Sequence, residues 1–293
     1  EKILAVTKAL LEAQHRHASA TMCNYGRVSR MLLASASGHL RPVHETNVPE
    51  HGPRRATAYL EGLQPEQPWH CSGDPDAAGV VSWVLTPLEL AHGKIWNELQ
   101  ALESCGATAG KWVAAARADA AATYGPEWRV LGLVSGGSWM PDASMFPVTS
   151  KVLAALDGVH AKLGGAPQDS LALQRCRVDE AFFAVQPPHT GIKPHSDNTN
   201  YILTAHLALD LEEGACWIQV GNERRYWSIG RAICFDTSYV HSTGNESDQP
   251  RTVLVVRFWH ADTTPLERTC INLYHKLCCN PSLVRRVLIE LAS

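Results

Sequence analysis

Residues 194–210 decide the fold, and they read PHSDNTNYILTAHLALD. A histidine and an aspartate, His195 and Asp197, stand two residues apart at the start of a long, mostly apolar run. In a β-strand, residues two apart project from the same face, so both side chains can reach one metal ion. The segment therefore predicts a metal site at the start of a β-rich region.

Short β-rich runs follow one another around and after this segment, and Gly, Pro, Asn or Asp separates them. Many short strands in close succession are typical of a β-sandwich or jelly-roll barrel. A further strand is expected over 128–134, a helix over 151–163 with Thr149 as its N-cap, and a C-terminal helix that begins at Thr264-Pro265. The main strands are expected over 181–186, 199–209, 215–220, 224–229, 232–236 and 252–259.

The N-terminal part of the chain has a different pattern. Residues 1–34 and 85–122 have apolar side chains at helical spacing, whereas 40–80 are rich in Pro, Gly and His and look irregular. We therefore predict a mainly β protein with flanking helices. Residues 1–124 form a mostly helical region packed on the core, and residues 125–293 form the β core with its C-terminal helix.

A third metal ligand is expected from His241, which follows the predicted strand 232–236. Two histidines and one carboxylate on one face of an octahedron leave three positions open. That arrangement suits non-haem iron(II), which binds a co-substrate and dioxygen together. Arg251 begins a run that looks like an interior strand, where a positive charge needs an anionic partner. The distal carboxylate of 2-oxoglutarate would serve.

Other interpretations of these residues remain open. His195 and Asp197 could be a polar pair in a surface turn, and His241 a structural histidine. Arg251 could pair with a structural carboxylate such as Asp236. A zinc-dependent hydrolase could use the same three ligands.

Residues 195–209 resemble the core of the aspartyl/asparaginyl β-hydroxylase family, as do residues 220–230 and 235–241. Segments 128–133 and 146–149 also match. The resemblance covers about residues 125 to 268 well, residues 60 to 125 faintly, and residues 1 to 58 not at all. It implies a double-stranded β-helix, the jelly-roll or cupin-like fold. It also implies hydroxylation that depends on iron(II), 2-oxoglutarate and O2 and releases succinate and CO2.

The resemblance also implies roles for individual residues. His195 and His241 occupy the two metal-binding histidine positions of the family, and Arg251 occupies the position that binds the distal carboxylate of 2-oxoglutarate. His206 occupies the position of a histidine beside the co-substrate. The alternative for His206 is a histidine that simply faces the barrel interior.

Several positions depart from the family pattern. Asp197 stands where the best-known animal members have Gly; it completes the His-x-Asp…His triad of the wider superfamily and favours hydroxylation over halogenation. Ala184 replaces a Ser that helps to hold 2-oxoglutarate. Ile202 and Thr204 replace arginines that contact the co-substrate and the acidic substrate, and Thr204 remains a candidate cofactor contact. A non-catalytic jelly-roll binding module is therefore an alternative, although the three ligands and Arg251 are all present.

Candidate substrate contacts flank the metal segment. They are His189, Lys193, Asn198 and Asn200, and Arg257, six residues beyond Arg251, is a further candidate. Arg54 and Arg55 in the N-terminal region are also possible contacts. The charged ones could bind an acidic group or could be solvated surface residues. Because the substrate arginines of the family are replaced, we expect hydroxylation of an amino-acid-like small molecule or an amino-acid side chain. A peptidyl aspartate or asparagine in a protein is the alternative.

Composition narrows the function further. Hydrophobic residues make up 45% of the chain and charged residues 19%, which is typical of a globular protein. A net charge of −3 argues against nucleic acid as a partner, and no apolar run is long enough for a membrane span. The nine cysteines are odd in number and their spacings fit no zinc module, so reduced thiols and a cytoplasmic location are expected. The chain begins at Glu1, which leaves room for an upstream targeting or anchor segment.

Overall fold

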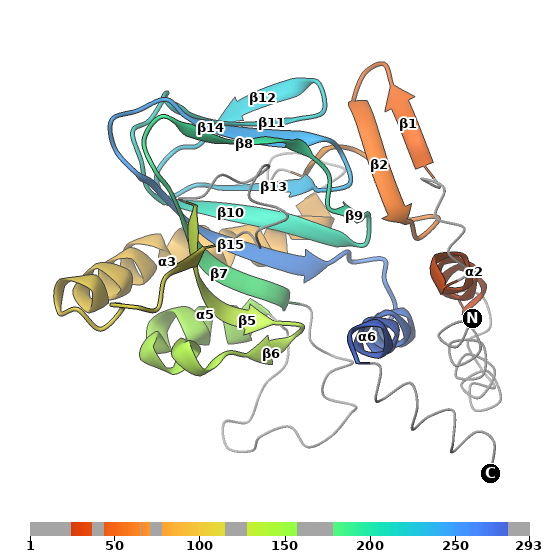
Figure 1. Ribbon diagram of the computed structural model, residues 1–293, viewed down its shortest axis with the longest axis horizontal. Helices are drawn as coiled ribbons and strands as arrows, with labels where there is room; N and C mark the ends of the chain where they lie inside the picture. The colour runs from red at the N-terminus through yellow and green to blue at the C-terminus, as the bar shows by residue number, and fades with distance from the viewer. Residues whose placement is uncertain are drawn as a thin grey trace, which may run out of the picture.

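Two antiparallel β-sheets face each other at the centre of the molecule (Figure 1). The computed structural model describes residues 25–36, 44–64, 66–70, 78–114, 128–156 and 178–280. The larger sheet has the order β3-β13-β10-β15-β7-β5-β4, and β6 also pairs with β5. Its strands are β3 (Trp69–His70), β13 (Ala232–Asp236), β10 (Ile202–Asp210), β15 (Arg251–Trp259), β7 (Val178–Gln186), β5 (Arg129–Ser135), β4 (Val113–Ala114) and β6 (Ser138–Trp139).

The smaller sheet has the order β12-β11-β14-β8. From β7 to β15 the chain passes back and forth between the two sheets, which is the topology of a double-stranded β-helix. The predicted fold class is therefore confirmed. The strands of this sheet are β12 (Glu223–Tyr226), β11 (Cys216–Val220), β14 (His241–Asn245) and β8 (Thr190–His195).

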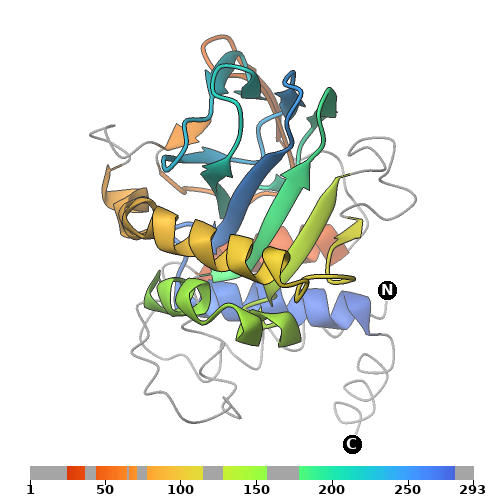
Figure 2. The same ribbon diagram turned by 90° about the vertical axis from the view of Figure 1, so that its left-hand side faces the viewer.

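The larger sheet is buried on both faces, and alternate residues serve different purposes. On β10, Leu203, Ala205 and Leu207 belong to the main hydrophobic core, whereas Thr204 and His206 face the interior between the sheets. Two helices, α3 (Ala78–Ser104) and α5 (Pro147–Leu156), cover the outer face (Figure 2). The strand period of two thus separates the residues that stabilise the fold from those that line a cavity.

The N-terminal region contains strands that the sequence did not predict. Residues that were expected to be irregular form a hairpin of β1 (His44–Val48) and β2 (Gly52–Ala58). Strand β2 also pairs in parallel with β9 (Asn198–Thr199). β8 and β14 were also not recognised as separate strands, because both are short and polar. These strands exist because they pair with distant partners and not because their own sequences favour them strongly.

Two helix boundaries differ from the prediction. α3 ends at Ser104 rather than near residue 122, because Gly106 and Gly110 adopt positive φ angles in the turns that follow. α5 begins at Pro147, so Thr149 is inside its first turn. The cap comes from Glu98 on α3, whose carboxylate accepts hydrogen bonds from the Val148 and Thr149 amides at 2.7 and 2.9 Å.

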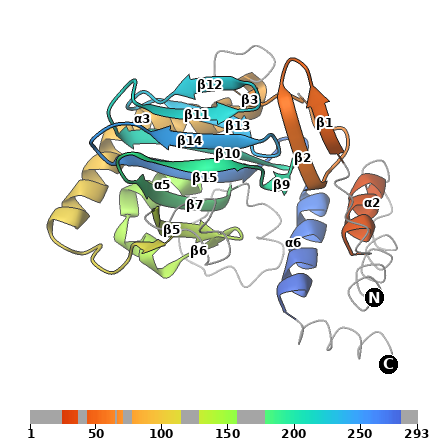
Figure 3. The ribbon, with the colours of Figure 1, turned by 45° about the horizontal axis from the view of Figure 1, so that its top comes forward.

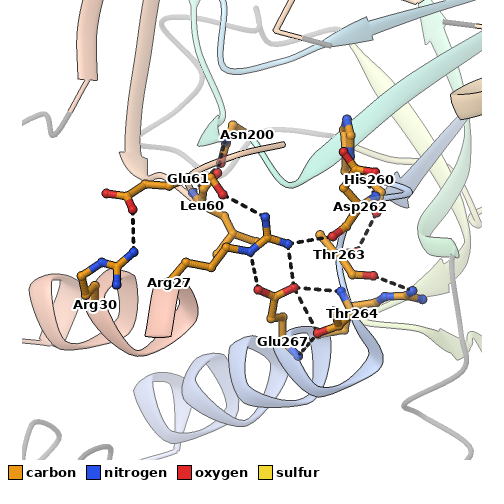
Figure 4. Close-up of polar contacts among 11 residues, drawn as sticks. Arg27, Arg30, Leu60, Glu61, Asn200, His260, Asp262, Thr263, Thr264 and Glu267 are labelled. Atoms are coloured by element: carbon orange, nitrogen blue, oxygen red, sulfur yellow. Dashed lines mark hydrogen bonds and ion pairs between the residues drawn. The ribbon is translucent and has the colours of Figure 1, made fainter. Parts of the chain in front are cut away.

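The C-terminal helix begins where the sequence predicts. α6 (Pro265–Cys279) has Thr264 as its N-cap. The Glu267 amide donates to the Thr264 hydroxyl at 3.2 Å, and the Thr264 amide donates to the Glu267 carboxylate at 2.8 Å, which is a capping box. Arg27 on α2 (Tyr25–Ala36) pairs with the same carboxylate and so joins the two helices (Figure 4).

Helices α2 and α6 lie at the same end of the molecule as the β1–β2 hairpin (Figure 3). Residues 1–24, 115–127, 157–177 and 281–293 lie outside the described residues, and so do the predictions that fall on them. The division of the chain at residues 124 and 125 stays a prediction. Among the described residues, none of the helices combines the length and apolarity needed to cross a bilayer.

Candidate metal centre

Three potential metal ligands converge at the end of β8 and the start of β14 in the smaller sheet. His195 is the last residue of β8, His241 is the first residue of β14, and these two residues are opposite each other in the strand pairing. Asp197 lies in the loop just after β8, not in a continuous strand as the spacing suggested. One ligand atom from each residue lies within 4.8 Å of the other two. The structure therefore brings the predicted triad together.

Backbone carbonyls orient both histidines. Nδ1 of His195 lies 2.8 Å from the carbonyl oxygen of Lys193, and Nδ1 of His241 lies 2.9 Å from that of Tyr239. Because a carbonyl only accepts, each Nδ1 must donate, which leaves Nε2 as the metal-binding atom. Burial lowers the pKa of His241 to about 4, so its ring is neutral at pH 7, as a metal ligand must be.

Asp197 has a different partner for each of its oxygens. Its Oδ2 lies 3.2 Å from Nη2 of Arg257, and its Oδ1 lies 3.9 Å from Nε2 of His195. Arg257 also pairs with Glu180 at 3.0 Å. Arg257, which was predicted as a substrate contact, lines the cavity beside the triad and lies between these two carboxylates, and its role stays a prediction. Because Arg257 contacts Oδ2 of Asp197, the other carboxylate oxygen, Oδ1, faces Nε2 of His195.

A cavity of about 430 Å³ adjoins the triad, between the two sheets. Its wall combines a few polar groups with an extensive apolar surface. The polar part includes Thr204, His206, Thr237, Thr243 and Arg251, and the apolar part includes Trp128, Val130, Phe182, Ala184, Ile192, Ile218, Phe235, Val253 and Val255. A mostly apolar cavity with a few convergent polar groups is the usual form of a small-molecule site.

Arg251 is fully buried in this wall and forms no ion pair within the described residues. Its side chain is 1% exposed, and its Nε and Nη1 have no hydrogen-bond partner there. The guanidinium lies 4.4 Å from the ring of Trp227, and burial lowers its pKa to about 10. The alternative partner Asp236 is wrong, because Asp236 pairs with Arg54 at 2.8 Å. A buried, unbalanced cation marks a site for an anion.

Other unsatisfied polar atoms line the same cavity. Oγ1 of Thr204, Oγ1 of Thr237 and Nδ1 of His206 are buried without a partner in the described part of the chain. His206 stacks on Trp227 with ring centroids 5.9 Å apart, and burial, with Arg251 nearby, lowers its pKa well below the usual value. A neutral histidine and two hydroxyls beside Arg251 match a ligand that carries several oxygens.

Several predicted substrate contacts lie elsewhere. His189 is exposed and pairs with Asp248 at 2.8 Å, and Lys193 is exposed next to the inward-facing Ile192. Asn200 is buried and bonds to the backbone of Leu60. The side chain of Asn198 lies outside the described residues, and Arg55 is exposed. None of these described side chains lines the cavity.

Some residues that line the cavity were not predicted from the sequence. Glu180 and Phe182 are on β7, opposite Arg257 and Val255 on β15. Strand alternation could have placed Phe182 beside Ala184 on the inner face. Trp128 and Val130 carry no such signal, because β5 joins the sheet beyond the barrel strands.

Residues 89–261, more than half of the chain, match the family model of the aspartyl/asparaginyl β-hydroxylases. The chain belongs to this family. The matched range contains the metal triad, His206 and Arg251. The β1–β2 hairpin lies before it, so this member of the aspartyl/asparaginyl β-hydroxylase family has structured residues that the family model does not match.

Individual relatives of this aspartyl/asparaginyl β-hydroxylase family member match over shorter segments. The mouse aspartyl/asparaginyl beta-hydroxylase is 31% identical over 110 residues, which are 36% of this chain and 15% of that protein. The ornithine lipid ester-linked acyl 2-hydroxylase of Rhizobium tropici is 34% identical over 80 residues, 27% of this chain and 28% of that protein. A Trichoplax adhaerens prolyl hydroxylase, solved with a hypoxia inducible factor peptide fragment, has a TM-score of 0.39 at 14% identity and covers 61% of this chain and 80% of that chain. The matched segments span less than a third of either curated relative.

Proposed function

We propose that this protein is an iron(II)- and 2-oxoglutarate-dependent dioxygenase that hydroxylates an unactivated C–H bond and releases succinate and CO2. The observation that carries the proposal is the position of Arg251. A fully buried arginine without a counter-ion in the described residues lines the same cavity as the His195, Asp197 and His241 cluster. A metal-binding cluster and a buried cation in one cavity fit a co-substrate that chelates at one end and is anionic at the other.

The residues present fit these groups. His195, Asp197 and His241 would hold the iron, and Arg251 would pair with the distal carboxylate of 2-oxoglutarate. When bound, the iron and 2-oxoglutarate supply the oxidation of the C–H bond by O2. The protein orients the two imidazoles through backbone carbonyls, and its apolar wall excludes water from the reacting groups.

The charges around the cavity bear on the substrate. Arg251 is assigned to the co-substrate, and Arg257 already lies between Asp197 and Glu180. No other Lys or Arg among the described residues lines the cavity, so an acidic side chain would lack a matching cation. We infer that the reacting carbon belongs to an apolar part of an amino-acid-like small molecule or amino-acid side chain. Peptidyl aspartate or asparagine is the less favoured alternative.

A lipid-like acyl chain is a second candidate substrate. It is favoured by the apolar wall that Trp128, Val130 and Phe182 add beside β7. The similarity to the Rhizobium tropici acyl 2-hydroxylase points in the same direction. Oxygen uptake and succinate release should be measured with three panels of compounds: free amino acids and their derivatives, acyl compounds, and peptides with Asp or Asn. Turnover confined to the acidic peptides would overturn the substrate inference.

The co-substrate assignment has a direct spectroscopic test. The protein is loaded with iron(II) and 2-oxoglutarate without oxygen, and the visible charge-transfer band of the chelate is recorded. Asp197→Ala should weaken iron binding and Arg251→Ala should weaken 2-oxoglutarate binding. Arg231→Ala, at an exposed arginine that pairs with Glu89, is the matched control.

The same preparation separates the rival functions. Absence of the band in the parent protein would defeat the co-substrate assignment. A zinc-dependent hydrolase would work without oxygen and would not bind 2-oxoglutarate. A binding module would release no succinate under any condition.

A further inference from the structure

Strand β2 lies beside the loop that carries Asp197. The hydroxyl of Ser196 donates to the carbonyl oxygen of Arg55 at 2.9 Å. Asn198, the residue after Asp197, pairs with Ala56 where β9 and β2 run parallel. The residues on both sides of Asp197 are therefore attached to the N-terminal hairpin, Ser196 by its side chain and Asn198 by its backbone.

The same strand also holds residues 236–240, the turn that leads into His241. The Arg55 amide donates to the carbonyl oxygen of Ser238 at 2.7 Å, and the Val240 amide donates to that of Pro53 at 2.9 Å. Residues 53–56 thus lie between the two loops that supply Asp197 and His241. These β2 residues precede the range that the family model matches.

One side chain of β2 enters this turn. Arg54 is 5% exposed, and its Nη2 lies 2.8 Å from Oδ2 of Asp236 while its Nε donates to the hydroxyl of Ser238 at 2.7 Å. The rings of Tyr59 and Tyr239 lie 5.1 and 5.0 Å from the guanidinium carbon. Charge, two hydrogen bonds and two aromatic rings therefore fix the guanidinium in one position.

The turn that Arg54 holds provides the hydrogen-bond acceptors of both ligand segments. The Tyr239 carbonyl accepts from Nδ1 of His241 at 2.9 Å, and the Thr237 carbonyl accepts from the Asp197 amide at 2.9 Å. Displacement of this turn would rotate the His241 ring and release the Asp197 loop at the same time. Partners of this kind commonly set the affinity of a metal site.

The hairpin is also anchored at its tip, away from the ligands. Gly221 has a φ of 57°, and a Cβ at this position would lie 1.8 Å from the carbonyl oxygen of His51. The side-chain amide of Asn222 donates to the Pro49 carbonyl at 3.1 Å. Contacts at both ends of β2 make the hairpin a rigid support and not a loose extension.

We propose that Arg54 is a positioning residue of the metal centre and that the β1–β2 hairpin is the element through which it acts. This inference rests on the proposed function, because it assumes that the triad binds a metal. Arg54 does not touch the metal or the substrate. It holds the turn whose carbonyls orient His241 and Asp197.

The test measures metal binding, with cobalt(II) as an oxygen-stable probe of affinity and geometry. Arg54→Met removes the charge and both hydrogen bonds, and the dissociation constant for cobalt(II) should rise roughly 10- to 100-fold. The visible absorption of bound cobalt(II) should change in shape, because the position of His241 changes. Arg54→Lys keeps a charge for Asp236 but not the second bond, so it should be intermediate.

Arg27→Met is the matched control for a merely structural effect. Arg27 also forms a largely buried pair with a carboxylate, Glu267, and its other partners are the backbone carbonyls of Glu61 and Asp262 (Figure 4). It contacts neither ligand loop among the described residues. Its loss should lower the free energy of unfolding and leave the affinity for cobalt(II) within about twofold of the parent.

The outcomes are distinguishable. If the parent does not bind cobalt(II), the proposed function fails, and the inference about Arg54 fails with it. If the parent binds and Arg54→Met binds equally well with an unchanged spectrum, only the positioning role is wrong. An equal loss of affinity in Arg27→Met would also overturn it. Should Arg54→Met fail to fold, Arg54→Lys and Asp236→Asn carry the same comparison.

Discussion

Replacement of Arg251 by Met should change stability and 2-oxoglutarate affinity in opposite directions. Arg251 is 1% exposed and has two nitrogen atoms without a partner among the described residues. In the ligand-free protein no anion among the described residues balances this buried charge, and the ring of Trp227 compensates only part of its desolvation. Methionine keeps the unbranched, flexible part of this side chain and fills part of its volume, but it loses the guanidinium contact with Trp227, whose ring lies 4.4 Å from the guanidinium carbon.

The magnitudes follow from the burial. Even a buried ion pair can commonly be exchanged for apolar residues of similar volume with a neutral or stabilising effect of about 1–4 kcal/mol, and a buried charge without an anion gains no ion-pair energy to offset its desolvation. We therefore expect the ligand-free Arg251→Met variant to be at least as stable as the parent. Loss of one partner of a buried charge pair costs about 2–5 kcal/mol of binding. At about 1.4 kcal/mol per tenfold, a loss of about 3 kcal/mol weakens 2-oxoglutarate binding on the order of 100-fold.

Urea unfolding with and without 2-oxoglutarate, in the presence of manganese(II), measures both quantities. In the parent, saturating 2-oxoglutarate should raise the free energy of unfolding, because it binds the folded state only. The variant should lose most of that increase. The reasoning is refuted if the ligand-free variant is destabilised by more than about 2 kcal/mol while 2-oxoglutarate still stabilises it fully.

Three further predictions concern other parts of the molecule. Burial lowers the pKa of His260 from 6.5 to about 4, so its contribution to the free energy of unfolding is complete above pH 6.5 and is lost as the pH falls toward 4. At pH 5 this loss is about 2 kcal/mol, so the free energy of unfolding in urea should fall less between pH 7 and pH 5 for His260→Asn than for the parent. Glu98→Ala removes the cap of α5 and should destabilise by about 1–2 kcal/mol in thermal unfolding, whereas an unchanged melting temperature would count against the cap. His195→Ala should weaken cobalt(II) binding at least about tenfold, whereas Lys193→Ala should leave it unchanged, because Lys193 contacts the His195 ring through its backbone carbonyl. Calorimetry that finds the same cobalt(II) affinity in both variants would contradict the role of His195 as a metal ligand.

Much of the β core could be predicted from local sequence. Along β10, apolar core residues alternate with Thr204 and His206, and this alternation can be seen in the sequence. It places Thr204 and His206 on the face of the strand that lines the cavity. The capping box at Thr264 and Glu267 is equally local, because its residues lie three apart. Such features could be predicted, since the interacting groups are close together in the sequence.

Long-range contacts could not be predicted in the same way. The cap of α5 comes from Glu98, about fifty residues before it, where the sequence favoured the local candidate Thr149. The hairpin β1–β2 looked irregular, because its stability comes from β9 and from the 236–240 turn. In both cases the deciding partner is far away in the chain, so the local pattern contains no trace of it.

At the metal centre too, some features follow from the sequence and others only from the tertiary structure. The sequence alone determined which residues could bind a metal, because His195, Asp197 and His241 have the right donor atoms and spacing. Only the tertiary structure decided what surrounds them. It paired Asp236 with Arg54 and left Arg251 without a counter-ion in the described residues. Donor chemistry belongs to single residues, whereas the balance of buried charge depends on which distant side chains the fold brings together.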